Sequence, residues 1–167
     1  YMLAQRVIAL PMTLVGKSIA DVFMPDAVDA LRDSMLGKLI DEIQSTLARV
    51  ALPPTVMLFI GAPDAFRLIF GPEWREAGEM VRWLTPMLFL QFITSPMSRV
   101  FFVVEKQKME LILQALLLGM RIASLFLAMY LSLELLSAVA LYAFGSSLGY
   151  FLYLCAINKV ADGHVSE

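Results

Sequence analysis

The chain has 167 residues, of which 59% are hydrophobic and 17% are charged, and its formal net charge at pH 7 is −2. A soluble domain of this size buries only about 70% of the surface that its unfolded chain exposes, so it could not remove this much apolar surface from water. The composition therefore predicts a membrane protein, and the weakly acidic balance excludes the basic surface that nucleic-acid binding requires.

The apolar stretches, taken in chain order, predict an all-α integral membrane protein with about five transmembrane helices. A hydrocarbon core of about 30 Å requires about 20 predominantly apolar residues per helix. The stretches that satisfy this requirement are residues 1–22, 43–62, 80–104, 111–133 and 135–158. Because the sequence starts inside an apolar pattern, we interpret it as the C-terminal piece of a longer protein.

Two further segments are polar. Residues 23–42 carry apolar side chains at helical spacing among charged ones, which predicts an amphipathic connection on the membrane surface. Residues 159–167 form a polar tail.

Basic residues in the connections indicate a direction. Six lie on the side of the C-terminus and two on the other, namely Arg32, Lys38, Arg99, Lys106, Lys108 and Lys159 against Arg67 and Arg75. The positive-inside rule then places the C-terminus in the cytoplasm.

Polar residues recur on one face of three predicted helices. The stripes are Arg6, Thr13 and Lys17; Gln91, Thr94, Ser95 and Ser98; and Gln107, Glu110, Gln114, Arg121 and Ser124. Convergence of these stripes on a hydrated cavity would explain all three. For the uncharged residues the alternative stays open that they hydrogen-bond to neighbouring helices, and Lys17 can extend to the membrane interface.

The two arginines within spans favour the cavity. An arginine at the centre of a membrane costs about 2.5 to 3.5 kcal/mol, so such residues normally face the interior of a helix bundle. We therefore expect Arg6 and Arg121 to be cavity cations, with Gln91, Gln114 and Lys17 as further cavity residues.

The charged stretch between the second and third spans is interpreted as a structural turn. Gly71 and Pro72 end one helix and begin the next, Arg75 and Glu79 are spaced to pair, and Trp74 with Trp83 fits an interfacial aromatic belt. On the last span, Gly145 and Gly149 form a G-x-x-x-G pattern that predicts close helix packing.

The sequence contains no nucleotide-binding loop, zinc-protease motif, paired cysteines or nucleophile elbow. We accordingly expect no enzyme activity, no metal and no cofactor.

Two stretches, residues 1–30 and 58–107, resemble bacterial lipid-linked oligosaccharide flippases of the multidrug/oligosaccharidyl-lipid/polysaccharide exporter superfamily. The first has an aromatic residue, Ala-x-Arg, Pro, Gly and Phe-x-Pro in the order of the family's eighth helix: Tyr1, Ala4 to Arg6, Pro11, Gly16 and Phe23 to Pro25. The second, from "LFIGAPDAF" to "FFVVEKQ", is similar to the ninth-to-tenth helix region.

The resemblance implies a twelve-helix, MATE-like transporter with two six-helix bundles around a central cavity, of which this chain supplies most of the C-terminal bundle. It implies movement of undecaprenyl-diphosphate-linked glycans, such as O-antigen or exopolysaccharide repeat units, across the bacterial inner membrane by alternating access and ion-gradient coupling. The implied partners are the lipid-linked oligosaccharide, membrane lipid, the N-terminal helices of the same protein and the glycan polymerase machinery. Arg6 matches the family's eighth-helix arginine, whereas Gln5 stands where related peptidoglycan-precursor flippases often have an acidic residue. The alternatives are a drug or cation exporter of the same superfamily and a non-transporting scaffold.

Overall fold

The computed structural model describes residue 30 and residues 35–163. The predicted first span, with Arg6 and Lys17, and nearly all of the amphipathic connection up to residue 34 lie outside the described residues. Within the described ranges the chain is helical and has no strand. The elements are α2 (Leu36–Phe70), the 3-10 helix η1 (Pro72–Trp74), α3 (Arg75–Met97), α4 (Val100–Val103), α5 (Gln107–Tyr130) and α6 (Leu135–Gly163).

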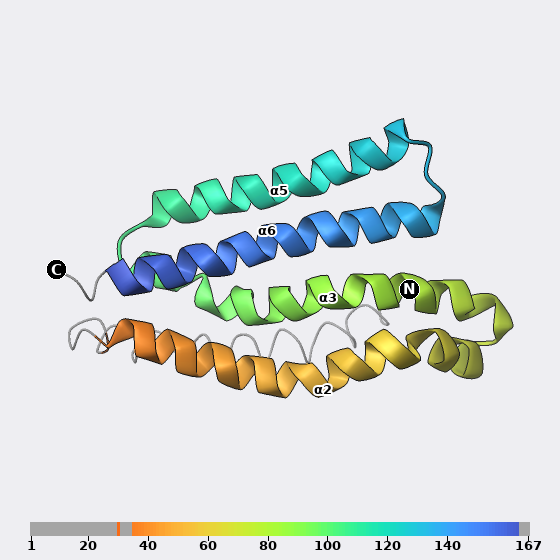
Figure 1. Ribbon diagram of the computed structural model, residues 1–167, viewed down its shortest axis with the longest axis horizontal. Helices are drawn as coiled ribbons and strands as arrows, with labels where there is room; N and C mark the ends of the chain where they lie inside the picture. The colour runs from red at the N-terminus through yellow and green to blue at the C-terminus, as the bar shows by residue number, and fades with distance from the viewer. Residues whose placement is uncertain (1–29, 31–34, 164–167) are drawn as a thin grey trace, which may run out of the picture.

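The four long helices lie side by side in the order α2, α3, α6 and α5 (Figure 1). Helices α2 and α3 are antiparallel, as are α5 and α6, whereas α3 and α6 run in the same direction. The turn between α2 and α3 and the turn between α5 and α6 lie at one end of the row. The start of α2, the short α4 and the end of α6 lie at the other end. Helix α6 contacts each of α2, α3 and α5, so it is the central element of the described part.

Four helical stretches in this part of the chain are long and apolar enough to cross a membrane: Leu36–Phe70, Pro72–Val103, Gln107–Tyr130 and Leu135–Ala161. Large apolar side chains cover their outer faces, with Met57 and Met129 each 75% exposed and Phe126 67% exposed. Such faces are stable only against lipid or further helices. The chain is an all-α membrane protein.

The helix α2 is longer than the span predicted at residues 43–62, because it runs from Leu36 to Phe70. Its charged residues other than Arg49 lie near its two ends, and the stretch between them, residues 43–63, has about the length that a hydrocarbon core of about 30 Å requires. The helix therefore continues beyond both surfaces of the core. A helix does not need to end where the membrane ends, so α2 runs without a break across residue 42, the predicted end of the surface segment.

The ends of the other helices also differ from those of the predicted spans, in most cases by about one turn. Helix α3 starts at Arg75 instead of residue 80, α5 starts at Gln107 instead of residue 111, and α6 continues to Gly163 through part of the predicted polar tail. The span predicted at residues 80–104 is divided, since α3 ends at Met97, directly after Pro96, and α4 is separate. Glu105 (φ 54°) and Ser132 (φ 49°) have left-handed backbone conformations. The first separates α4 from α5, and the second separates α5 from α6.

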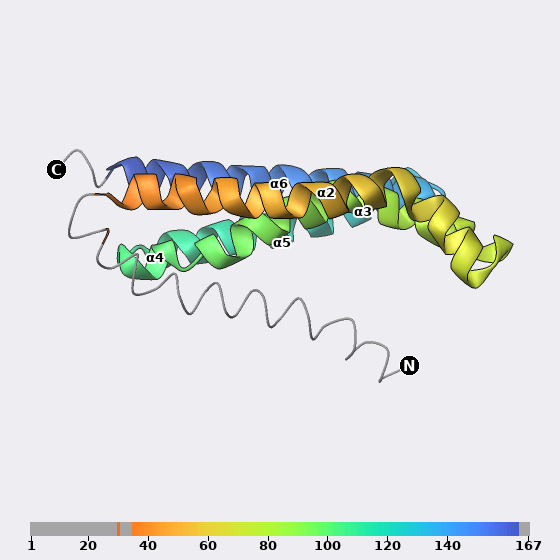
Figure 2. The same ribbon diagram turned by 90° about the horizontal axis from the view of Figure 1, so that it is seen from below.

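Three prolines, Pro53, Pro54 and Pro63, lie inside α2, and two, Pro86 and Pro96, lie inside α3. Each removes a backbone hydrogen bond and favours a bend. The α2–α3 hairpin bends to one side toward its tip, as Figure 2 shows.

The turn after α2 matches its sequence prediction. Gly71 has φ 107° and ψ 169°, a region that only glycine adopts readily, and Pro72 begins η1. The rings of Phe70 and Trp74 lie 5.5 Å apart across the turn. The prediction that Arg75 pairs with Glu79 is wrong, because Glu79 lies 3.7 Å from the guanidinium of Arg82, one turn further along α3.

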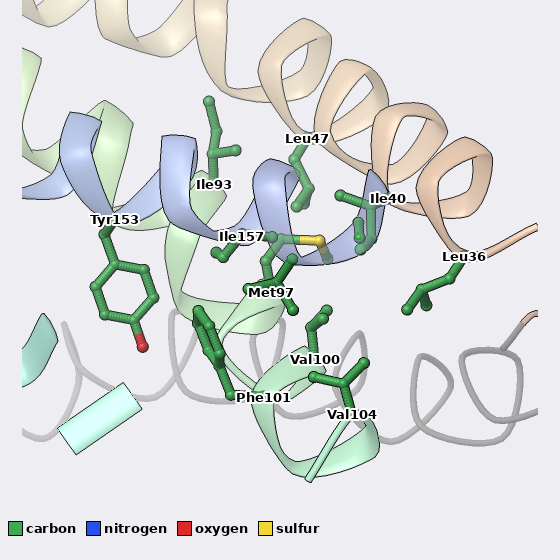
Figure 3. Close-up of a cluster of buried hydrophobic side chains, with 12 residues drawn as sticks. Leu36, Ile40, Leu47, Ile93, Met97, Val100, Phe101, Val104, Tyr153 and Ile157 are labelled. Atoms are coloured by element: carbon green, nitrogen blue, oxygen red, sulfur yellow. The ribbon is translucent and has the colours of Figure 1, made fainter. Parts of the chain in front are cut away.

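The main apolar cluster lies at the end of the row that contains α4 (Figure 3). It joins side chains of α2, α3, α4 and α6, among them Ile40, Met97, Phe101 and Ile157, each of which has no exposed surface. The ring of Phe101 meets the ring of Tyr153 edge to face at 5.8 Å. This cluster fixes α6 against α2, α3 and α4 and so determines which face of α6 turns toward α5.

A side-chain hydrogen bond joins α2 to α6 beside this cluster. The Nε2 atom of Gln44 donates to Oδ1 of Asn158 at 2.7 Å, and the pair is partly buried. We expect Asn158→Ala to lower the free energy of unfolding of the intact protein by about 0.6 to 1.7 kcal/mol, the range measured for polar pairs between membrane helices. Unfolding by increasing SDS in mixed micelles measures this change.

Ser45→Ala is the matched control, because the exposed Ser45 hydroxyl donates only to Glu42 of its own helix. If Asn158→Ala and Ser45→Ala have the same stability, the interhelical bond contributes nothing.

Candidate functional site

The polar stripe predicted on α5 lies along its contact with α6. Leu117, Ser124 and Ala128 are buried there, Glu110 and Arg121 are half-buried, and Gln114 is exposed. The spacing of these residues by three, four or seven positions places them on one side of the helix. The stripe therefore runs along the α6 contact, and Gln114 remains exposed beside it.

Close packing of α5 against α6 depends on two glycines of α6. A Cβ atom at Gly145 would collide with the Ser124 hydroxyl, and one at Gly149 would lie 2.6 Å from Cδ1 of Leu117. The close packing predicted from the G-x-x-x-G pattern is confirmed. This approach brings the side chain of Arg121 next to α6.

Arg121 is held by Tyr150 of α6. Its Nη2 donates to the Tyr150 hydroxyl at 2.8 Å, and its Cζ lies 5.4 Å from the centre of that ring. Its Nε is buried and has no hydrogen-bond partner among the described residues. A guanidinium has five N–H donors, so a positively charged group with unused donors is fixed within a membrane span.

Three helices fix Tyr150 in turn. It is 8% exposed and packs with Met87 of α3 and Leu117 of α5. Its position is therefore set by the packing of α3, α5 and α6 together, and the orientation of Arg121 depends on all three.

Two more buried polar atoms lie on the same side of α6. The hydroxyl of Ser146, one turn before Tyr150, and the hydroxyl of Tyr153 both lack a partner in the described part of the chain. Ser146 has no exposed surface and Tyr153 is 2% exposed. Figure 3 shows Tyr153 at the edge of the apolar cluster, beside Phe101. Buried polar groups nearly always bind a protein group or a water, so a partner is expected for each of these hydroxyls, and Gln114 of α5 lies near that of Tyr153.

Most other hydroxyls in the spans bond to their own helix. Thr85, Thr94, Ser124 and Ser147 each donate to the carbonyl four residues earlier, at 2.7 to 2.8 Å. Ser98 donates to the carbonyl of Ser95 at 2.9 Å. These bonds occupy the hydroxyl protons locally, so Thr94, Ser98 and Ser124 do not donate to neighbouring helices.

The remaining predicted residues are placed as follows. Gln91 is exposed on α3, one turn beyond Met87, and Gln114 is exposed on α5, two turns before Arg121. The structure therefore brings Arg121 together with α6 but shows neither glutamine in contact with it. Arg6 and Lys17 lie outside the described residues.

The sequence prediction missed Tyr150 as the partner of Arg121. The available signal was the glycine pattern, because residues adjacent to Gly149 must lie near α5 once the two helices pack closely. The Gln44–Asn158 pair was also missed, since each residue is a single amide in a long helix.

Comparison with known proteins gives one match. Residues 1–79 match the family model of polysaccharide biosynthesis proteins. The matched range contains α2, η1 and the first residues of α3, and it includes Arg6 and Lys17. Arg121 and Tyr150 lie beyond it. No curated protein and no solved structure matches the chain.

The family match covers only part of the two stretches that resemble the flippases. The first resembling stretch, residues 1–30, lies within the matched range, and the second, residues 58–107, lies within it up to residue 79. The N-terminal part of the chain is thus similar to polysaccharide biosynthesis proteins, and the described part is a set of membrane helices.

Proposed function

We propose that the chain is the C-terminal part of a flippase that moves undecaprenyl-diphosphate-linked glycan repeat units across the bacterial inner membrane by alternating access. The movement is coupled to an ion gradient and includes no chemical conversion of the glycan. The family match supports a role in polysaccharide biosynthesis, and the membrane helices support a role within the bilayer.

The observation that carries the proposal is the state of Arg121. It is half-buried on a membrane-spanning helix, its Nη2 is bound to Tyr150, and its Nε has no partner in the described part of the chain. A guanidinium in this state is suited to a diphosphate, because planar N–H donors form paired, charge-assisted hydrogen bonds with phosphate oxygens. Binding an anion also offsets the cost of about 2.5 to 3.5 kcal/mol of placing an arginine within the membrane.

The amides supply the second part of the proposed site. Gln91 and Gln114 are exposed on α3 and α5, where their donors and acceptors are available to sugar hydroxyls. In this proposal Arg6 and Lys17 are further cations of the cavity, and the N-terminal helices of the same protein close it.

The distribution of charge supports a direction. The start of α2, the connection before α5 and the end of α6 lie at one end of the helix row, and they carry Lys38, Lys106, Lys108 and Lys159. The opposite end, with the turns after α2 and α5, carries Arg67 and Arg75. We therefore place the lysine-rich end, including the C-terminus, in the cytoplasm.

Reconstitution of the intact protein tests this function. The protein is placed in proteoliposomes with a fluorescent undecaprenyl-diphosphate oligosaccharide in both leaflets, and a membrane-impermeant quencher is added outside. A flippase makes nearly all of the probe accessible, whereas protein-free liposomes expose only about half of it, the share of the outer leaflet. The intact protein with Arg121→Gln is the matched negative control.

Two outcomes contradict the proposal. Accumulation of a cationic dye with no movement of the glycan lipid assigns the protein to drug or cation export. No movement of either probe, in a preparation that is folded and correctly inserted, assigns it to a scaffold in glycan assembly.

A further inference from the structure

An apolar groove lies between α2 and α3, on the membrane-spanning part of both helices. From α2 it is lined by Leu52, Thr55, Val56, Phe59 and Ile60, which follow one another at helical spacing. From α3 it is lined by Pro86, Phe89 and Leu90.

The groove presents no polar surface, although one hydroxyl lines it. The Thr55 hydroxyl donates to the Ala51 carbonyl of its own helix at 2.7 Å, so its proton is already bound. An occupant of the groove must therefore be apolar along its length, because a polar group there would lose its hydrogen bonds to water and gain none.

A cation lies at one end of the groove. The guanidinium of Arg82 is 5.3 Å from the ring centre of Phe59, which is a lining residue. Glu79 is 3.7 Å away and both side chains remain partly exposed, so this ion pair leaves most of the five guanidinium donors free. Trp83, 46% exposed, is the next residue and fits the level of the lipid headgroups.

The length of the groove agrees with one leaflet. Eight residues of helix separate Arg82 from Leu90, which is about 12 Å along the axis. Half of a hydrocarbon core is about 15 Å. An amphiphile with an anionic head at Arg82 would thus extend its chain along the groove without crossing the middle of the bilayer.

From this combination of a cation at the rim, a wholly apolar lining and the length of one leaflet, we infer that the groove between α2 and α3 binds an anionic phospholipid of the surrounding membrane. The phosphate binds to Arg82 and one acyl chain lies between Phe59 and Leu90. The headgroup binds at Arg82 rather than at Arg121, and the inference does not depend on the transported substrate. Leu90 of the groove also packs against the cluster of Met87, Leu117 and Tyr150.

Native mass spectrometry of the intact protein tests the inference. The protein is purified in mild detergent with equal amounts of phosphatidylglycerol and phosphatidylcholine of the same chain length. We expect retained phosphatidylglycerol to exceed phosphatidylcholine by about tenfold, the effect of one charge-assisted contact. Arg82→Gln removes this preference, and Leu90→Trp, which fills the groove, removes retention of both lipids.

Arg75→Gln is the matched control. Arg75 is exposed at the start of the same helix, carries the same charge and lies two turns before Arg82, outside the lining of the groove. The preference must survive this change, since a loss equal to that of Arg82→Gln would show only general attraction of anionic lipid. Val56→Trp fills the groove from the other wall and replaces Leu90→Trp if that variant does not fold.

Two further results overturn the inference. One is equal lipid retention by the wild type and a folded groove-filling variant. The other is displacement of phosphatidylglycerol by an equimolar polyprenyl phosphate, which would identify the groove as a site for the tail of a polyprenyl lipid.

Discussion

Arg121→Gln in the intact protein is expected to reduce export of the lipid-linked glycan by about 10- to 100-fold, while the protein still inserts into the membrane. The loss corresponds to about 1.5 to 3 kcal/mol, the usual contribution of a hydrogen bond to a charged group. Glutamine keeps part of the side-chain length but removes the charge and the paired donors. The amount of glycan on the cell surface, normalised to the amount of protein in the membrane, measures the effect.

Three variants distinguish substrate binding from loss of structure. Arg121→Lys keeps the charge without the planar pair of donors, so it should restore only part of the activity. Tyr150→Phe removes the hydroxyl that holds Nη2, 2.8 Å away, and leaves the guanidinium present, so the loss should be several-fold smaller than that of Arg121→Gln. Arg99→Gln removes an exposed arginine at the start of α4 and should leave export unchanged. Normal export by Arg121→Gln would refute a role for Arg121 in binding the diphosphate.

Gly78→Ala is expected to destabilise the protein by about 1 to 3 kcal/mol, although it adds a single methyl group. The new Cβ would lie 2.6 Å from the carbonyl oxygen of Ala62 and 2.6 Å from Cα of Pro63. Both contacts are with backbone, which cannot move aside as a side chain does, so α2 and α3 must separate. Unfolding of the intact protein in SDS mixed micelles, followed by circular dichroism, measures the loss.

Gly61→Ala is the matched control on the same hairpin. No heavy atom lies within 4 Å of a Cβ built at Gly61, so alanine meets nothing there. Its higher helix propensity should stabilise the protein by about 0.5 to 1 kcal/mol. If Gly78→Ala and Gly61→Ala change the stability in the same direction, the close approach of the α2 and α3 backbones at Gly78 does not explain the loss.

Features that depend on composition and local chemistry were predictable from the sequence. The apolar runs predicted spans that largely coincide with parts of α2, α3, α5 and α6, because a membrane helix must present apolar side chains on nearly all sides. Gly71 and Pro72 predicted their turn because only glycine readily adopts the conformation at that position. The boundaries were less predictable, since polar residues such as Lys38 and Asn158 continue a helix beyond the hydrocarbon core without any break in the pattern.

Features that depend on the rotation of one helix against another were not predictable. The charge of Arg121 in its span indicated a special residue, but its partner Tyr150 depends on how closely α6 approaches α5. Helical spacing allowed Glu79 to pair with either Arg75 or Arg82. In the structure Glu79 pairs with Arg82, whose guanidinium also stacks on the ring of Phe59 of α2. The partners of the serine and threonine hydroxyls were not predictable, because the same residue types bond either to their own helix or to a neighbouring helix.

The two hydrogen bonds that join side chains of different helices in the described part, Gln44 to Asn158 and Arg121 to Tyr150, both end on α6. Displacing α6 along its axis by one turn, about 5.4 Å, would break both of them. Sliding α2 against α3 and α6 would break only the Gln44–Asn158 bond, because the rest of the α2–α3 contact consists of apolar side chains, the stacking of Arg82 on Phe59 and the close approach at Gly78. Among the described helices, α6 therefore resists displacement along its axis more than α2 does. Both polar contacts fix its register against its neighbours.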